Sequence, residues 1–224
     1  MKLLDRDIKL AIFDLDGTLI VSTGVWADVD KSFFSKRGMD VPKNYQKEIA
    51  HIGLKEAAKI TKEKYCPNEN IEDIIEEWKE MVIEEYRDKI GLKEGAKELL
   101  DKLISLGVHL ALATANNKDL YEPCLKRLEI YDYFDFIIDV NSTKEGKNSS
   151  EIYDKVSEHF NLSRENVMVI EDLPQALNTA YNAGYLTIGI YDPSTSKSDK
   201  EMEKICHLYV KDHNKISYLI DNEN

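Results

Sequence analysis

Two carboxylates directly follow a short apolar run near the start of the chain. The sequence AIFDLDGTLI spans residues 11–20 and places Asp14 and Asp16 two positions apart, just before Gly17 and Thr18. On an extended backbone, side chains two positions apart share a face, so both acids can reach one bound group. Placing two charges at the end of an apolar strand is costly unless something compensates them. We therefore interpret the pair as reacting or ligating groups rather than as ordinary loop or helix-cap residues.

Polar side chains also close later apolar runs of the sequence. They are Thr114, the lysines Lys144 and Lys147, and the acids Glu171 and Asp172. Together with Asp14 and Asp16, these groups could hold a cation and a phosphoryl group, whose charge needs compensation as it transfers. The elements of the fold must therefore bring the ends of these runs to one place.

Short continuous apolar runs alternate with helical patterns over most of the chain. The runs expected to form strands are residues 9–14, 108–114, 134–140, 166–172 and 186–191. The expected helices lie near residues 93–107, 118–129, 150–160 and 173–184. This alternation predicts a parallel sheet covered on both faces, and right-handed crossovers make it a doubly wound, Rossmann-like α/β core. Ligands of such sheets bind beyond the carboxyl ends of the strands, where the polar residues fall.

An all-helical segment interrupts this alternation after the first strand. No strand pattern occurs from Val25 to about Ile90, and the spacing of apolar residues predicts a long amphipathic helix over 70–90 with Asn70 as its N-cap. We expect residues 21–89 to form an inserted helical cap domain and residues 1–20 and 90–224 to form the core. Trp26 and Trp78 are expected in the interior of the cap.

A cation between Asp14 and Asp172 would explain the cost of the buried charge. Hard oxygen ligands with no His or Cys nearby favour Mg²⁺. A metal flanked by Thr and Lys side chains is equipped for phosphoryl chemistry.

The ordered motifs DLDGTL, LAT, EGKNSSEIY and VIEDLPQALNTAYNAG resemble those of the haloacid dehalogenase superfamily. The resemblance covers nearly the whole chain and is to the phosphatase and β-phosphoglucomutase-like branch, which has a helical cap after the first motif. It implies that Asp14 is the nucleophile, which becomes an aspartyl phosphate, and that Asp16 is the general acid/base, with its backbone carbonyl on the metal. It also implies that Asp172, assisted by Glu171, completes the Mg²⁺ shell.

The same resemblance suggests which residues bind the substrate. Thr114 and Lys147 would hold the phosphoryl oxygens, with Ala115 and Asn116 beside them. The family pattern GKPxPD appears here as GKNSSE, and the loss of both prolines leaves Lys144 as an alternative to Lys147. Ser22 in the linker and His51 in a cap turn are further candidates for contacts with the substrate.

These observations predict a Mg²⁺-dependent phosphatase of a small phosphorylated metabolite, such as a sugar phosphate, with an aspartyl-phosphate intermediate. The second acid, Asp16, favours phosphoryl transfer over carbon–halogen cleavage. A phosphomutase of the β-phosphoglucomutase type shares every core motif and remains an alternative. A non-catalytic phospho-acceptor module resembling a receiver domain is a third possibility, although it needs neither Asp16 nor a cap.

Composition sets the remaining expectations. The 224 residues are 42% hydrophobic and 32% charged, which is typical of a globular protein, and the net charge of −12 argues against nucleic-acid or membrane partners. Cys66, Cys124 and Cys206 have no metal-ligand spacing and are interpreted as reduced thiols. With no signal-peptide or membrane-span pattern, we expect a cytoplasmic protein that is a monomer or a weak homodimer.

Overall fold

The computed structural model describes residues 1–49, 53–195 and 199–223. The chain divides into two compact units. The core unit comprises residues 1–23 and 90–224, and the helical unit comprises residues 24–89. Each unit is described by itself below.

A six-stranded, fully parallel sheet forms the centre of the core unit. Its strands are β3 (Leu10–Phe13), β4 (His109–Thr114), β5 (Phe136–Asp139), β6 (Val167–Glu171), β7 (Leu186–Ile190) and β8 (Leu208–Val210). Their order across the sheet is β5-β4-β3-β6-β7-β8. All residues of β3, β6 and β7 are buried, as expected for strands covered on both faces.

The strand order creates a topological switch point at β3. The chain leaves β3 for β4 and β5 on one side, then returns to β6 and continues outward on the other side. In the register of β3, Phe13 lies opposite Leu112 of β4 and Ile170 of β6. The carboxyl ends of these three strands therefore lie level beside one another, which is where open α/β sheets bind ligands.

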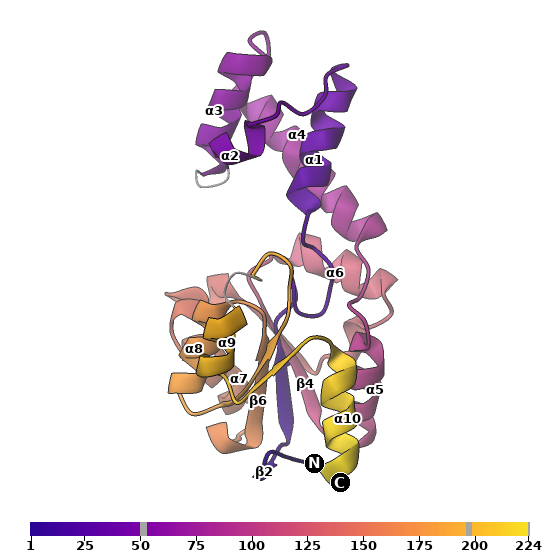
Figure 1. Cartoon of the computed structure of the whole chain (residues 1–224), viewed down its shortest axis with the longest axis vertical. Helices are drawn as coiled ribbons and strands as arrows, with labels where there is room; N and C mark the ends of the chain where they lie inside the picture. The colour runs from indigo at the N-terminus through magenta and orange to yellow at the C-terminus, as the bar shows by residue number, and fades with distance from the viewer. Residues whose placement is uncertain (50–52, 196–198, 224) are drawn as a thin grey trace. The chain divides into compact units, whose positions relative to one another are not determined.

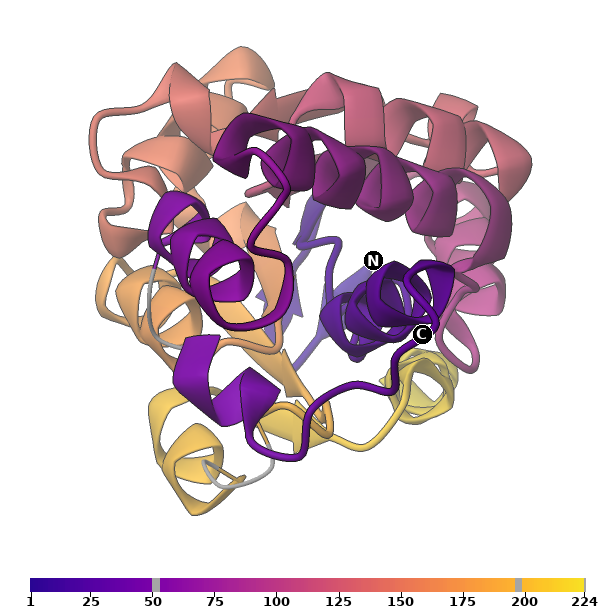
Figure 2. The same ribbon diagram turned by 90° about the horizontal axis from the view of Figure 1, so that it is seen from above.

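Helices cover both faces of this sheet. They are α5 (Ala96–Ser105), α6 (Lys118–Arg127), α7 (Glu151–His159), α8 (Pro174–Asn182), α9 (Asp199–Ile205) and α10 (His213–Glu223). Helices α5 and α10 lie together on one side of the strands, and α7, α8 and α9 lie on the other (Figure 1). Seen from above, β3 lies inside the ring of later core elements (Figure 2). The predicted doubly wound core with an inserted helical segment is confirmed.

Short helical turns complete the connections of the core. They are η2 (Tyr131–Tyr133), η3 (Val140–Ser142), η4 (Gly146–Asn148) and η5 (Arg164–Asn166). Of these, η4 matters for function because it carries Lys147 between β5 and α7.

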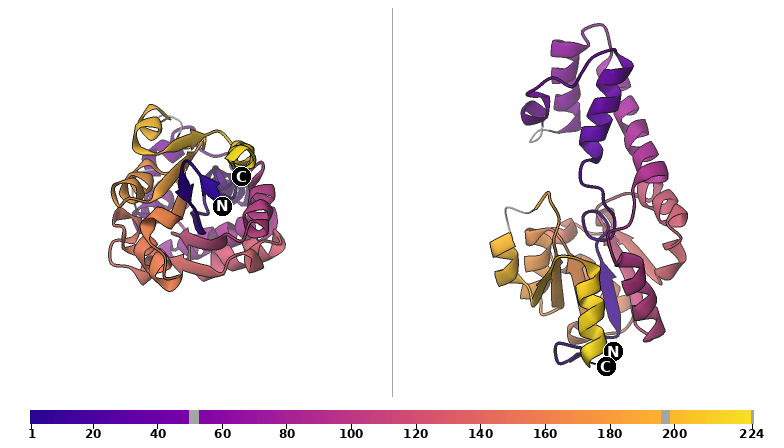
Figure 3. Two further views of the ribbon diagram at one scale, coloured as in Figure 1. Left: turned by 90° about the horizontal axis from the view of Figure 1, so that it is seen from below. Right: turned by 45° about the vertical axis from the view of Figure 1, so that its right-hand side comes forward.

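The two ends of the chain meet at the edge of the core opposite the carboxyl ends of the strands. Strands β1 (Lys2–Leu3) and β2 (Arg6–Asp7) form a small hairpin whose turn residues, Leu4 and Asp5, both have positive φ. The Leu4 amide donates to Glu223 of α10, over 2.7 Å. Figure 3 shows the two termini side by side.

The helical unit has its own buried interior. It contains α1 (Val25–Lys36), α2 (Tyr45–Ile49), α3 (Leu54–Tyr65), α4 (Ile71–Glu84) and the π-helical turn η1 (Glu85–Lys89). The predicted helix over 70–90 thus changes to a π-helical turn in its last five residues. Trp78 is buried, as expected, whereas Trp26 is 53% exposed, so the expectation of an interior position for Trp26 was wrong. Position 26 lies on the outer face of α1, whose buried face is formed by Val25, Val29 and Phe33.

Among the described residues, none of the helices has the length and apolar character that a bilayer span requires.

Candidate active site

The loop after β3 brings its two acids to the edge of the sheet. The Asp14 amide donates to the Ile170 carbonyl over 3.0 Å, which continues the pairing with β6 past the end of the strand. Gly17 then turns the chain with φ +73°, and a Cβ atom at this position would lie 2.5 Å from Asp172 Oδ2. Only glycine therefore fits here, because both the conformation and the space exclude a side chain. Thr18 Oγ1 donates to Asp172 Oδ1 over 3.2 Å, so the loop is tied to the end of β6.

Three buried carboxylates converge at this edge. Asp14, Glu171 and Asp172 are 6%, 0% and 2% exposed, and each offers an oxygen within 4.8 Å of the others. They come from two neighbouring strands, β3 and β6, whose ends are level. Such a concentration of negative charge needs a cation nearby.

Lys147 supplies one positive charge to this cluster. Its ammonium donates to Asp14 Oδ1 and, over 2.8 Å, to Glu171 Oε2, and its side chain is only 10% exposed. Lys144, the alternative from the sequence, is exposed, and its backbone amide donates to Glu151. Of the two lysines, it is Lys147 that reaches the acids.

The titration properties of the cluster follow from its burial. Burial, reinforced by the charge of Asp14, raises the pKa of Glu171 to about 7 although Lys147 acts in the opposite direction. Burial, together with the charges of Glu171 and Asp14, raises the pKa of Asp172 to about 8. Burial acts to lower the pKa of Lys147, but the charges of Asp14 and Glu171 outweigh it and raise that pKa above its usual range. The lysine is therefore charged, and it does not fully compensate the three acids.

The residues present fit a hard divalent cation. Asp14 and Asp172 provide carboxylate oxygens, and Asp172 accepts a hydrogen bond of 3.2 Å from the Thr18 hydroxyl, a neutral donor that does not compensate its charge. A divalent ion would bind this carboxylate and offset the cost of burying its charge, the cost that raises its pKa. Buried acids able to hold a metal ion are thus present where the sequence predicts them.

A second group of residues holds Asp16. Asn116 Nδ2 donates to Asp16 Oδ2 over 2.5 Å, and the Asn116 amide donates to Thr114 Oγ1 over 3.1 Å. Thr114 is the last residue of β4 and is fully buried, whereas Ala115 is exposed beside it. The end of β4 therefore orients the second acid through an amide side chain.

Two candidates from the sequence remain, Ser22 in the linker and His51 in the helical unit. Ser22 is half-buried on the segment that leaves the core toward the helical unit. His51 lies outside the described residues. The structure describes no contact between Ser22 and the three carboxylates.

Sequence reasoning missed two charged residues beside the site. Asp192 is the second residue after β7 and is fully buried, and Lys93 lies just before α5. The Lys93 ammonium donates to the Gly17 carbonyl and forms an ion pair of 2.9 Å with Asp192 Oδ2. The position of Asp192 at the end of a fifth apolar run was a signal equivalent to that of Asp14 and Asp172.

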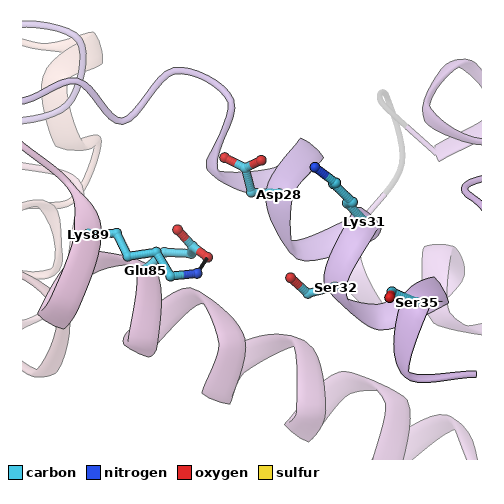
Figure 4. Close-up of a pocket in the computed structure, with 6 residues that line it drawn as sticks. All are labelled: Asp28, Lys31, Ser32, Ser35, Glu85 and Lys89. Carbon is cyan, nitrogen blue, oxygen red and sulfur yellow. Dashed lines mark hydrogen bonds and ion pairs between the residues drawn. The ribbon is translucent and has the colours of Figure 1, made fainter.

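A separate polar cavity lies wholly within the helical unit. Its volume is about 370 Å³, and it is lined by Asp28, Lys31, Ser32, Ser35, Glu85 and Lys89. Figure 4 shows these side chains on α1 and on η1, with Lys89 paired to Glu85. None of the candidate residues for catalysis belongs to this cavity.

Comparison with known proteins identifies the family. Residues 11–190 match the haloacid dehalogenase-like hydrolases, so the chain belongs to that family. A phosphorylated carbohydrates phosphatase of Thermotoga maritima is 29% identical over 181 residues, which cover 79% of this chain and 82% of the relative. Glycerol-1-phosphate phosphohydrolase 1 of Saccharomyces cerevisiae is 28% identical and covers 96% of this chain and 86% of the relative. The predicted enzyme class, a phosphoric monoester hydrolase, is confirmed.

Solved structures support the same fold. A Thermotoga maritima protein solved as a candidate β-phosphoglucomutase superposes with a TM-score of 0.82 at 23% identity, covering 96% of this chain and 99% of that one. A β-phosphoglucomutase from Clostridium difficile superposes with a TM-score of 0.65 at 23% identity, covering 96% of each chain. At these identities the likeness concerns the fold.

Proposed function

We propose that this protein is a Mg²⁺-dependent phosphatase that hydrolyses a small phosphorylated metabolite through an aspartyl phosphate on Asp14. The observation that carries the proposal is the position of Asp14. It is a buried carboxylate in contact with Lys147, it shares a possible metal site with Asp172, and it lies on the same loop as Asp16. This arrangement supplies a nucleophile, compensation for charge and a second acid within one edge of the sheet.

In the first step, the Asp14 carboxylate attacks phosphorus and the ester oxygen leaves. Asp16 in its protonated form donates a proton to that oxygen, and Asn116 holds its carboxyl group in place. Lys147 contacts Asp14 and therefore lies where phosphoryl oxygens would gather as Asp14 attacks.

In the second step, water attacks the phosphorus of the aspartyl phosphate and restores the Asp14 carboxylate. Asp16, now ionised, accepts the proton of the attacking water and returns to its starting form. Asp14 and Asp172, with the Asp16 carbonyl, would hold Mg²⁺, and Glu171 would assist through its contact with Lys147. When bound, Mg²⁺ would compensate the charge of the phosphoryl group and bring the nucleophile and the ester together.

The relatives support a small polyhydroxylated substrate. Their names specify phosphorylated carbohydrates, glycerol 1-phosphate and validoxylamine A 7′-phosphate, the last at 24% identity over 91% of this chain. Each of these is a phosphate ester on a compact molecule with several hydroxyl groups. We infer that this chain takes a substrate of the same chemical class.

The test is a panel of phosphorylated sugars, polyols and organic acids, with release of inorganic phosphate as the measurement. We expect turnover that is lost in excess chelator, restored by Mg²⁺ and supported poorly by Ca²⁺, whose looser coordination misplaces the nucleophile. Asp14→Asn is the control for contaminating phosphatases. Interconversion of sugar phosphate isomers that depends on a sugar bisphosphate would instead establish the phosphomutase, and full activity in chelator would overturn the metal site.

A further inference from the structure

Lys93 occupies an enclosed position beside the loop of the active site. Its side chain is 13% exposed, although lysine is normally a surface residue. The ammonium donates to the carbonyl oxygens of Gly17 and, over 2.7 Å, Tyr191, and it pairs with Asp192 Oδ2 over 2.9 Å. Two hydrogen bonds to backbone carbonyls thus hold the ammonium in place, and the Asp192 carboxylate compensates its charge.

Asp192 gathers further donors on its other oxygen. Asp192 Oδ1 accepts from Thr23 Oγ1 over 2.6 Å, from the Ser194 amide over 2.9 Å and from Ser194 Oγ over 2.6 Å. The fully buried carboxylate is thus bonded to the loop after β7, to the segment that leaves the core and, through Lys93, to the segment that returns.

The outgoing and returning segments are also paired through their backbones. Ile20 and Leu92 form an antiparallel bridge, and the Val21 amide donates to the Gly91 carbonyl over 2.9 Å. The Lys93 amide donates to Leu19 over 2.8 Å. The backbone of Lys93 therefore lies directly beside the loop of residues 14–20, and its ammonium crosses that loop to reach β7.

Gly17 is the point where this junction can influence chemistry. It follows Asp16 directly, and its Cα is packed so closely against Asp172 that no Cβ would fit. A shift of Gly17 therefore carries Asp16 with it and changes the separation of that residue from Asp172.

We propose that Lys93 and Asp192 are positioning residues, whose ion pair fixes the loop of residues 14–20 against the end of β7 and so sets the placement of Asp16 relative to Asp172. The catalytic part of this inference rests on the proposed function. The structural part, the immobilisation of the loop, does not.

The test uses the full chain with the substitutions Lys93→Met and Asp192→Asn. Methionine removes the charge and the donors at similar length, and asparagine keeps an acceptor for Thr23 while removing the ion pair. The matched control is Lys102→Met, because Lys102 also pairs with a carboxylate, Asp221 at 2.5 Å, and donates to a backbone carbonyl, but lies against α10. Lys93→Arg keeps the charge and the donors and should retain most of the function.

Two measurements are made on each variant. Hydrogen–deuterium exchange of peptides covering residues 14–20 reports the loop directly, and calorimetric Mg²⁺ titration with steady-state kinetics on p-nitrophenyl phosphate reports its consequence. Lys93→Met should accelerate exchange in this segment, weaken Mg²⁺ binding about tenfold and lower kcat about tenfold, with KM changed much less. Asp192→Asn should change all three in the same direction, and Lys102→Met should change none of them.

Exchange in residues 14–20 that is the same in Lys93→Met and Lys102→Met would overturn the proposal, whatever the activity. Faster exchange with unchanged Mg²⁺ affinity and kcat would show a purely structural role and would also overturn it. If Lys93→Met does not fold, the same measurements on Asp192→Asn and the wild type replace it, and unchanged exchange, or faster exchange with unchanged Mg²⁺ affinity and kcat, overturns the proposal. A wild-type protein without phosphatase activity would overturn the proposed function alone, since the exchange measurement is independent of it.

Discussion

Asp14 combines two properties whose consequences can be separated by one substitution. It is the proposed nucleophile, and its charge contributes to the raised pKa values of Glu171 and Asp172. Asp14→Asn should reduce turnover by at least about 10⁴-fold, because no covalent intermediate can form. The substitution should not lower the melting temperature of the metal-free protein, since it also removes the repulsion between Asp14 and the carboxylates of Glu171 and Asp172. Steady-state kinetics and a thermal melt in chelator check both statements, and substantial residual turnover would exclude Asp14 as the nucleophile.

Asp16 should matter for proton transfer, with Asn116 acting through it. Asp16→Asn should slow the reaction by roughly 10²–10⁴-fold, the usual contribution of a general acid/base. Asn116→Ala should produce a smaller loss, because Asp16 keeps its carboxyl group but loses the 2.5 Å bond that orients it. Asn117→Ala is the matched control, since the neighbouring side chain caps α6 and affects only stability, by about 1 kcal/mol. Equal losses of activity at positions 116 and 117 would contradict this role.

The two lysines near η4 can be compared directly. Lys147→Met removes the ammonium from Asp14 and Glu171 and should cost about 3 kcal/mol of transition-state stabilisation, as for loss of one preorganised electrostatic contact. Lys144→Met removes an exposed side chain and should leave kcat/KM unchanged. The kinetics of both variants on the same substrate provide the measurement. A silent Lys147→Met and a damaging Lys144→Met would reverse the assignment.

At the scale of elements, α10 contains a histidine that should make folding sensitive to acid. His213 is fully buried, its Nδ1 lies 3.3 Å from the Glu94 carbonyl, and burial lowers its pKa to about 4. The folded-state pKa lies below the unfolded value of about 6.5, so this contribution to stability is complete above pH 6.5 and is lost as pH falls toward 4.

Wild-type protein should therefore lose about 2 kcal/mol of unfolding free energy between pH 7 and pH 5 through this group. His213→Leu, which cannot be protonated, should lack that part of the loss. Urea denaturation at both pH values measures the difference, with His109→Gln at the exposed start of β4 as the control. The same pH dependence in His213→Leu and the wild type would refute the assignment.

The sheet was predictable where its strands are buried on both faces. Strands β3, β4, β6 and β7 appear in the sequence as continuous apolar runs, since neither face meets water. Strand β8 was not predicted. It is an edge strand of only three residues, two of them half-buried, so it leaves no continuous apolar run in the sequence. The β1–β2 hairpin was missed for a related reason: its turn uses Leu4 and Asp5 at positive φ, without the glycine that usually marks such turns.

The candidate site was likewise predictable from the sequence only in part. Asp14, Glu171 and Asp172 could be placed together because each closes an apolar run, and parallel strands end at one edge. The orientation of Asp16 by Asn116, and the three-way contact of Lys93, could not be read from spacing. Both depend on how far long side chains reach across loops, and only the packed structure determines that.

For the whole molecule, net charge and burial act on the choice of substrate in different ways. The charge of −12 repels any polyanion over distances up to the screening length, which is about 10 Å at 0.1 M salt. Asp14 is 6% exposed and the side chain of Lys147 is 10% exposed, so the phosphoryl group must enter a recessed position. A small monoester can meet both conditions, whereas a phosphate on a folded protein cannot reach the recessed position.

Salt should separate these two effects. The rate on a small sugar or polyol phosphate should change little between 50 and 500 mM NaCl, because only one phosphate approaches and its binding contacts are buried. Any weak rate on the 5′-phosphate of an oligonucleotide should rise with salt as repulsion is screened, yet stay far below that on the small ester. The rate on a folded phosphoprotein should stay low at every salt concentration, because salt does not change the burial of Asp14. kcat/KM for the three substrates across the salt series tests this, and a phosphoprotein rate equal to that of the best small ester would contradict the argument from burial.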